Sequence, residues 1–300
     1  MADISETTPL INENAELQSY YQSLESRIGY RLVLGGTRHF GYWEKDTWFP
    51  FPISSALRRM EQKLYDKLDL PEGATVLDAG CGVAHVALFM AHRGLKVTGI
   101  DVIDHHIVKA RRNIKKANLL KGQVSVRKAD YHNLDFFADE SFDGVYTMET
   151  LVHATDLEKV LRGFFRILKP GGRLVEKEYE TINVNSAQDT GALADDVASV
   201  VALSAMPLDL MKEGNLKAKL EQTGFVDVQV EDYSENVRPM LRLFFCLAIV
   251  PYTIFKLLGV EKYFVNTMAG AGGLLGQKHW RFISVKATKP GGPLESEKTK

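Results

Sequence analysis

The chain has 300 residues, 45% of them hydrophobic and 25% charged, a composition typical of a soluble globular protein that can bury its own core. The formal net charge of −1 excludes the long-range attraction to nucleic acid that a strongly basic protein exerts. Only two cysteines, Cys81 and Cys246, are present, and they form neither a metal-ligand spacing nor a disulfide framework. The sequence therefore predicts a cytoplasmic protein that binds no nucleic acid.

The first 70 residues divide into a tail and a helical segment. Residues 1–15 are polar and acidic, so we expect a disordered tail. They lack the basic and apolar regions of a signal peptide, so we expect none. Helical periodicity over 16–34 is followed by the aromatic run 39–43 and by a second helix from about 54 to 68. We interpret residues 16–70 as an N-terminal helical segment that forms a lid.

Short apolar runs then alternate with helical stretches, which predicts one α/β domain over residues 71–289. The continuous apolar runs favour a parallel sheet with helices on both faces. Inserts are expected at about 183–207 and 236–278, and a disordered tail at 290–300. The predicted strands are 74–78, 96–101, 124–128, 142–147, 173–179, 225–230 and 280–285, and the helices between the first five are 83–93, 103–117 and 157–168.

A glycine-rich turn follows the first predicted strand. The strand ends in Asp78, and Gly80 and Gly82 open the next helix, where a tight turn lets a ligand approach the backbone. The dinucleotide-binding pattern requires a third glycine at position 85, which is His85 here. A carboxylate at Asp78 suits a cationic ligand better than a pyrophosphate. The turn therefore favours S-adenosylmethionine, which carries an ammonium and a sulfonium and no phosphate.

Further cofactor residues are predicted at the ends of the next strands. Asp101, with Val102 beside it, is placed to accept hydrogen bonds from both ribose hydroxyls. Asp130 and Tyr131 are expected at the adenine, and Met148 beside the methionine part of the cofactor. Each acid taken alone is equally well explained as a solvated loop residue. Their order at successive strand ends predicts a cofactor site.

Five motifs resemble those of class I S-adenosylmethionine-dependent methyltransferases: Val76–Ala84, Gly99–Asp101, Ala129–Asp130, Phe142–Val145 and Leu168–Gly172. The resemblance is tight over residues 70–180 and loose over the last two strands. It implies a Rossmann-like, seven-stranded, mostly parallel sheet with helices on both faces, whose final strand runs antiparallel. It also implies that S-adenosylmethionine is the cofactor.

A narrower resemblance links the segments His39–Trp43, Tyr146–His153 and Arg238–Arg242 to sterol 24-C-methyltransferases and to fungal methyltransferases of natural-product pathways. Sterol enzymes carry the segment Tyr-Glu-x-Gly-Trp-Gly where this chain has Arg31–Arg38, so the acidic groups expected to steady a carbocation are missing. This favours N- or O-methylation of a hydrophobic small molecule. Sterol-type C-methylation is one alternative. A cofactor-bound cyclase or isomerase without net methyl transfer is another.

Four residues are candidates for catalysis. His153 and Glu149 follow the fourth strand and are expected near the methyl group, where His153 is suited to act as a base. His39 is expected to close over the site from the lid, and Glu178 to reach the cleft from the fifth strand. A packing role explains each of them as well. The pair His105–His106 lacks a third ligand at metal-site spacing, so we predict surface histidines and no metal site.

The later insert contains an apolar stretch, Leu243–Leu258, interrupted by Pro251 and Lys256. At roughly 16 residues it is shorter than the ~20 that cross a bilayer, which argues against a transmembrane helix. We retain three interpretations of this region. It is a lid over a hydrophobic substrate, a homodimer contact through 239–270, or a peripheral contact with an intracellular membrane.

Overall fold

The computed structural model describes residues 33–182, 212–260 and 263–291. The predicted tail at 1–15, nearly all of the helix at 16–34, the insert at 183–207 and most of the tail at 290–300 lie outside these residues.

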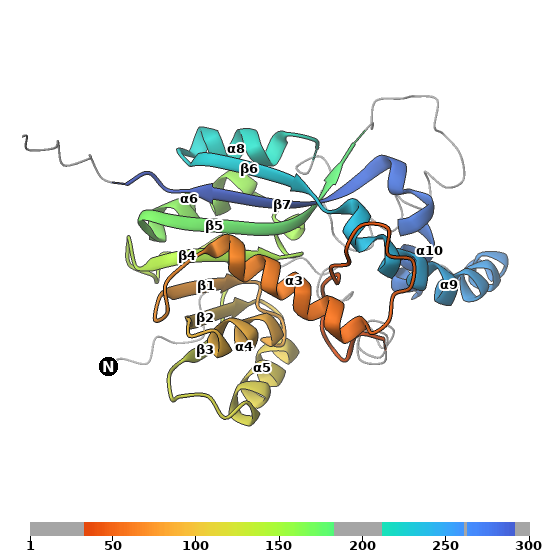
Figure 1. The fold of residues 1–300 in the computed structure, drawn as a ribbon, viewed down its shortest axis with the longest axis horizontal. Helices are drawn as coiled ribbons and strands as arrows, with labels where there is room; N and C mark the ends of the chain where they lie inside the picture. Colours follow the sequence, from red (N-terminus) through yellow and green to blue (C-terminus); the bar gives the residue numbers. More distant parts are fainter. Residues whose placement is uncertain (1–32, 183–211, 261–262, 292–300) are drawn as a thin grey trace, which may run out of the picture.

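A single seven-stranded sheet organises the domain, with the strand order β3-β2-β1-β4-β5-β7-β6 (Figure 1). β7 is antiparallel to both of its neighbours, whereas the pairs among β1 to β5 are parallel. The predicted fold class is confirmed. The strands are β1 (Thr75–Ala79), β2 (Lys96–Asp101), β3 (Val124–Lys128), β4 (Phe142–Met148), β5 (Leu168–Thr181), β6 (Val226–Asp232) and β7 (Trp280–Thr288).

Helices cover both faces of the sheet and bury two apolar clusters against it (Figure 1). On one face lie α3 (Ile53–Leu68), α4 (His85–His92) and α5 (Asp104–Lys116). On the other lie α6 (Leu157–Ile167) and α8 (Asn215–Thr223). Between the last two strands, α9 (Ser234–Leu258) and α10 (Val265–Leu275) project beyond the end of the sheet, and the short helices η1 (Leu151–His153) and η4 (Gln277–His279) follow β4 and α10.

β5 begins earlier than the sequence predicted. The segment Lys169–Gly172, which precedes the predicted strand, is part of it. The pairing with β4 shifts between Phe142 and Gly144, and Gly171 has a φ of +76°, so the strand accommodates an irregularity without ending.

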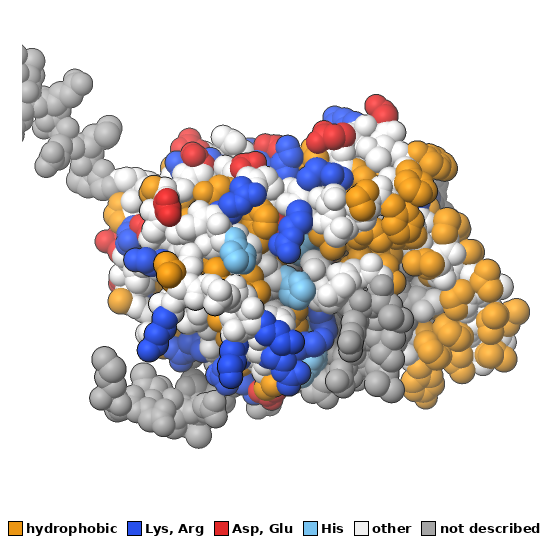
Figure 2. Space-filling view, turned by 60° about the horizontal axis from the view of Figure 1, so that its bottom comes forward, with side chains coloured by type: hydrophobic (Ala, Val, Ile, Leu, Met, Phe, Trp, Pro, Cys, Tyr) orange, Lys and Arg blue, Asp and Glu red, His pale blue; other side chains and the backbone are white. Residues whose placement is uncertain are grey.

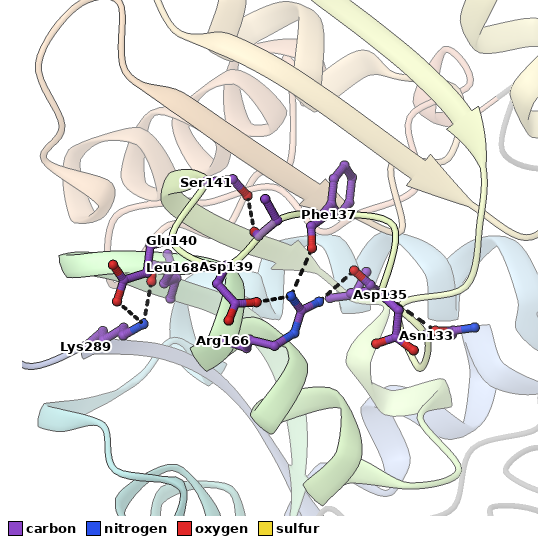
Figure 3. Close-up of polar contacts among 11 residues, drawn as sticks. Asn133, Asp135, Phe137, Asp139, Glu140, Ser141, Arg166, Leu168 and Lys289 are labelled. Carbon is purple, nitrogen blue, oxygen red and sulfur yellow. Dashed lines mark hydrogen bonds and ion pairs between the residues drawn. The ribbon is translucent and has the colours of Figure 1, made fainter. Parts of the chain in front are cut away.

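The loop between β3 and β4 is held by Arg166 of α6 (Figure 3). Its guanidinium donates to the carbonyl oxygens of Phe137 at 2.9 Å and Leu134 at 2.8 Å. The same loop begins at Asp130, so these bonds fix the backbone that carries a predicted cofactor residue.

Three glutamates of β5, Glu176, Glu178 and Glu180, are all buried. Glu180 has partners on two neighbouring segments. Its carboxylate accepts a hydrogen bond from Arg281 of β7 at 2.7 Å and another from the Gly214 amide. The partners on β7 and before α8 compensate for the loss of water.

Glu176 is the exception among the three. Neither of its carboxylate oxygens has a hydrogen-bond partner among the described residues, and burial raises its pKa well above 4.5. A group whose pKa is higher in the folded state favours folding at low pH and opposes it as the pH rises. We therefore expect Glu176→Leu to raise the free energy of unfolding by about 2 kcal/mol at pH 8, and by less as the pH approaches 4.5. Denaturant titrations across this range measure the difference, and a pH-independent difference would contradict the assignment.

α9 corrects the length argument made from the sequence. It runs for 25 residues with Pro239 and Pro251 inside it, and it is the one described helix long and apolar enough to cross a membrane by length and composition. Its second half packs against α10. The rings of Phe255 and of Phe264, the residue before α10, stack with their centroids 3.8 Å apart. This packing supports the helix at Pro251, which has no N–H group to donate the usual helical hydrogen bond.

One face of α9 is exposed and apolar. Val250 is 65% exposed and Leu257 83% exposed. Figure 2 shows hydrophobic side chains gathered at the end of the molecule where α9 and α10 project. The exposed stripe of α9 consists of Leu247, Val250, Ile254, Leu257 and Leu258, which recur at helical spacing.

Candidate active site

A cleft of about 880 Å³, counted out to its open mouth, lies at the carboxyl ends of the first strands. This is the position at which the strand order reverses between β1 and β4, where open α/β sheets bind ligands. The cleft is lined by all eight predicted cofactor residues and by three of the four predicted catalytic residues: Asp78, Gly80, Gly82, Asp101, Val102, Asp130, Tyr131, Met148, His39, Glu149 and His153.

The glycine turn is held by backbone bonds. The amides of Gly80 and Cys81 both donate to the carbonyl of Ile100 at 2.9 Å. Gly80 has a φ of +95°, and a side chain there would meet Thr150 at 2.6 Å. Gly82 has a φ of +52° and open space where a side chain would be. The turn thus needs glycine at position 80 for packing and leaves space beside position 82 for a ligand.

Asp78 has the properties of a receptor for a cation. It is buried at the end of β1, and its Oδ2 atom has no hydrogen-bond partner among the described residues. Burial raises the pKa of Asp78 to about 7, and the nearby carboxylate of Asp101 adds to that shift. Tyr146 opposes this shift, but a buried carboxylate with an unpartnered oxygen is costly, and a cationic ligand reduces that cost. This arrangement fits the ammonium of S-adenosylmethionine.

Asp101 is fixed from three sides. Its carboxylate accepts from the amides of Gly82 and Ile103, each at 2.8 Å, and lies 3.2 Å from Nδ1 of His106. Burial alone would raise its pKa, but His106 and these amides outweigh that effect and lower it. The expectation that His106 is a surface residue is wrong, because the first turn of α5 folds its ring back onto the end of β2.

Asp130 is held by a neighbour that the sequence reasoning missed. Nδ1 of His132 lies 2.6 Å from the Asp130 carboxylate, and Nε2 of His132 lies 3.0 Å from the amide of Thr155. Since Nε2 accepts the amide proton, Nδ1 carries the ring proton and donates it to Asp130. The buried His132 therefore ties the predicted adenine residue to the loop after η1. Tyr131 is tied to the same region, because its hydroxyl donates to the Thr150 carbonyl at 3.0 Å.

Glu149 joins the lid to the cleft. Its carboxylate accepts from the Phe40 amide at 2.6 Å and from the hydroxyl of Tyr179. Burial raises its pKa to about 7, although both hydrogen bonds and His39 oppose that shift. Both oxygens are thus engaged in holding other parts of the protein. Glu149 acts in this structure as a positioning group at the mouth of the cleft.

His39 is buried against α3. Nε2 lies 3.5 Å from the Glu61 carboxylate, and Nδ1 lies 2.9 Å from the Phe40 carbonyl. Burial lowers its pKa, but Glu61, the Phe40 carbonyl and Glu149 together raise it above 6.5. These contacts place the His39 imidazole at the wall of the cleft.

Glu178 does not line the cleft. Its carboxylate lies behind the loop that follows β4 and accepts from the amides of Thr150 at 2.8 Å, Leu151 at 2.6 Å and Val152 at 3.3 Å. It therefore shapes the loop that carries the buried His153. Alternation along β5 predicted that the side chain turns toward the cleft, but the sequence contains no signal for the loop that intervenes.

The fold and the cleft define a class of protein, the enzymes built on the S-adenosylmethionine-dependent methyltransferase fold. The family described as a methyltransferase domain matches residues 77–175. The chain is 47% identical over 277 residues to the S-adenosyl-L-methionine-dependent Diels-Alderase iccD of Talaromyces variabilis, which covers 91% of this chain and 94% of that protein. This chain belongs to the family of S-adenosylmethionine-dependent methyltransferase-fold enzymes, as its motifs predicted.

Two further relatives show the range of the family. The O-methyltransferase resE of Aspergillus sclerotiorum is 32% identical over 211 residues, covering 70% of this chain and 76% of that protein. The crystal structure of the [4+2]-cyclase SpnF superposes with a TM-score of 0.67 at 24% identity, covering 89% of this chain and 95% of that one, which shows a shared fold. The predicted cofactor, S-adenosylmethionine, is confirmed by the family. When bound, it supplies a sulfonium charge and a methyl group that can be transferred.

Proposed function

We propose that this enzyme catalyses a [4+2] cycloaddition within a hydrophobic natural product and uses S-adenosylmethionine without transferring its methyl group. The likeness to a Diels-Alderase over 91% of the chain carries this proposal. In such a reaction a conjugated diene and an alkene of one substrate combine. Two of their three π bonds are replaced by two new carbon–carbon σ bonds, and the third π bond shifts to the middle of the former diene. No atom leaves, so the product is an isomer of the substrate.

The state of Glu149 supports cycloaddition over proton abstraction. Both carboxylate oxygens of Glu149 already accept hydrogen bonds, from Phe40 and Tyr179, and each of these bonds lowers the pKa of Glu149 and weakens it as a base. A cycloaddition requires no base. It requires that the two reacting ends are held together in a cleft that excludes water, and Thr37, Arg38 and His39 border that space.

The proposal is tested with an acyclic substrate that contains a conjugated diene and an alkene, together with S-adenosylmethionine. We expect the diene absorbance to fall, a product of unchanged mass, and no S-adenosylhomocysteine. Accumulation of one S-adenosylhomocysteine per product, with a product heavier by one CH₂ unit, would overturn the proposal in favour of methyl transfer.

Methyl transfer to nitrogen or oxygen is the second candidate, because the chain is 32% identical to a fungal O-methyltransferase. The two reactions differ in their need for a base, and we propose that His153, which lines the cleft, would be that base in methyl transfer. His153→Gln should lower O-methylation by about 100-fold or more, the usual contribution of a general base. It should lower cycloaddition by less than about 10-fold, because no proton moves in that reaction.

We further propose that the exposed stripe of α9 makes a peripheral contact with an intracellular membrane, while the enzyme remains cytoplasmic. The segment 236–259 contains no acidic residue but has Arg238, Arg242 and Lys256. The aromatic side chain of Trp48, 74% exposed, lies beside this helix under Arg242. Basic and aromatic residues around an apolar helix face suit an anionic lipid surface.

A double variant of the stripe, Val250→Ser with Leu257→Ser, should abolish co-sedimentation with vesicles of phosphatidylcholine and phosphatidylserine. Val108→Ser, an exposed apolar residue on α5, should leave it unchanged. If the unmodified enzyme stays in the supernatant and sedimentation velocity shows a dimer that the double variant lacks, the stripe is a homodimer contact instead.

A further inference from the structure

Two side chains of opposite charge line the cleft. Asp78, at the end of β1, is buried and has an unpartnered Oδ2 atom among the described residues. Arg38 comes from the lid, and its Nη1 atom is buried. It is the one arginine or lysine among the described residues that line the cleft. A fixed cation and a buried anion therefore border the same space.

The backbone that carries Arg38 is fixed to the rest of the domain. We name residues 37–43 the strap. On one side of Arg38, the Thr37 hydroxyl lies 3.2 Å from Nδ1 of His85 on α4. On the other side, the Phe40 amide donates to Glu149. Farther along, the strap is bonded to α9, where the Trp43 amide donates to the Asn236 carbonyl at 3.0 Å. Arg38 is thus held over the cleft by its own flanking residues.

Three of the four histidines that line the cleft have partners on other elements. His39 is paired with Glu61, His85 with Thr37, and His106 with Asp101. Arg38 is the one side chain in this lining that stays cationic at any working pH, so a carboxylate that enters the cleft beside the strap meets a permanent positive charge there. A guanidinium binds a carboxylate through two parallel hydrogen bonds, which gives both strength and orientation.

The methionine part of S-adenosylmethionine ends in a zwitterion, an ammonium and a carboxylate on one carbon atom. We propose that Arg38 binds this carboxylate while Asp78 receives the ammonium, so that the strap holds the amino-acid end of the bound cofactor. The inference rests on cofactor binding alone and holds for cycloaddition and methyl transfer equally. It adds Arg38 to the cofactor residues that the strand-end motifs predicted.

The test uses isothermal titration calorimetry without substrate and three ligands. S-adenosylmethionine carries both charges of the zwitterion, decarboxylated S-adenosylmethionine lacks the carboxylate, and 5′-methylthioadenosine lacks the whole amino-acid end. We expect Arg38→Gln to weaken S-adenosylmethionine binding by about 10-fold to 100-fold and to leave the other two ligands unchanged. Asp78→Asn should weaken S-adenosylmethionine and its decarboxylated form, and should leave 5′-methylthioadenosine unchanged.

Two additional variants separate charge recognition from folding. Arg38→Lys should recover part of the lost affinity, because an ammonium keeps the charge but not the paired hydrogen bonds. Arg162→Gln, an exposed arginine of α6, should bind all three ligands like the unmodified enzyme. Equal weakening of all three ligands by Arg38→Gln, or unchanged binding of S-adenosylmethionine, would overturn the proposal. Because no turnover is measured, the outcome is independent of which reaction the enzyme catalyses.

Discussion

Gly80→Ala should weaken S-adenosylmethionine binding by about 100-fold and lower the free energy of unfolding by about 2 kcal/mol. The residue has a φ of +95°, which costs energy in any residue with a side chain. In addition, the new methyl group would lie 2.6 Å from the side chain of Thr150, whose hydroxyl is bonded to the Ala79 carbonyl. Either the glycine turn or the loop after β4 must move, and both border the cleft. Calorimetric titration and chemical denaturation measure the two effects.

Gly122→Ala is the matched control. Gly122 has a φ of +84°, close to that of Gly80, but nothing lies within 4 Å of an added side chain, and it does not line the cleft. This variant should lose stability through backbone strain and bind the cofactor normally. If Gly80→Ala and Gly122→Ala bind the cofactor equally well, the contact with Thr150 does not shape the site.

That the predicted cofactor residues meet in one cleft could be predicted because the fold determines their positions. Parallel strands bring their carboxyl ends to one edge, so Asp78, Asp101 and Asp130 had to meet once the strands were recognised. The side chains that hold two of these acids in place could not be predicted in the same way. His106 and His132 contact Asp101 and Asp130 through local turns of the chain. A histidine two to five residues after a strand-end acid is the signal that would have identified both.

The lid and α9 were harder to predict, because their conformations depend on contacts distant in sequence. Arg38 lies in the cleft because its neighbours bond to α4 and to Glu149, more than 100 residues away in the second case. The sequence pattern treats Pro251 as an interruption of a helix. Phe255 packs against Phe264, the residue before α10, and this contact supports the part of α9 that follows Pro251. The periodicity of the α9 sequence gives no indication of that contact.

Glu178→Ala should lower the free energy of unfolding by roughly 3 to 5 kcal/mol, the largest loss of stability that we expect from one substitution. The carboxylate accepts three amide hydrogen bonds, from Thr150, Leu151 and Val152, and alanine offers no acceptor in its place. A buried amide without a partner costs about 1 to 3 kcal/mol. Because the released loop carries Thr150 and His153, cofactor affinity should fall as well. Chemical denaturation and calorimetric titration measure these two losses.

Glu178→Gln distinguishes hydrogen bonding from charge. The Thr150 and Leu151 amides both donate to the same oxygen, Oε1, which glutamine retains, whereas Val152 donates to Oε2, which becomes an amide donor. The glutamine variant should therefore lose only about 1 kcal/mol. The exposed Glu221, truncated to alanine, should change stability by less than about 0.5 kcal/mol. Equal losses for Glu178→Ala and Glu178→Gln would show that ionisation, rather than the three accepted bonds, is what the loop requires. Burial raises the pKa of Glu178 to about 8. Below that pH the group is a neutral carboxyl that still accepts hydrogen bonds at Oε1. A neutral glutamine, which also accepts there, should therefore lose less stability than alanine.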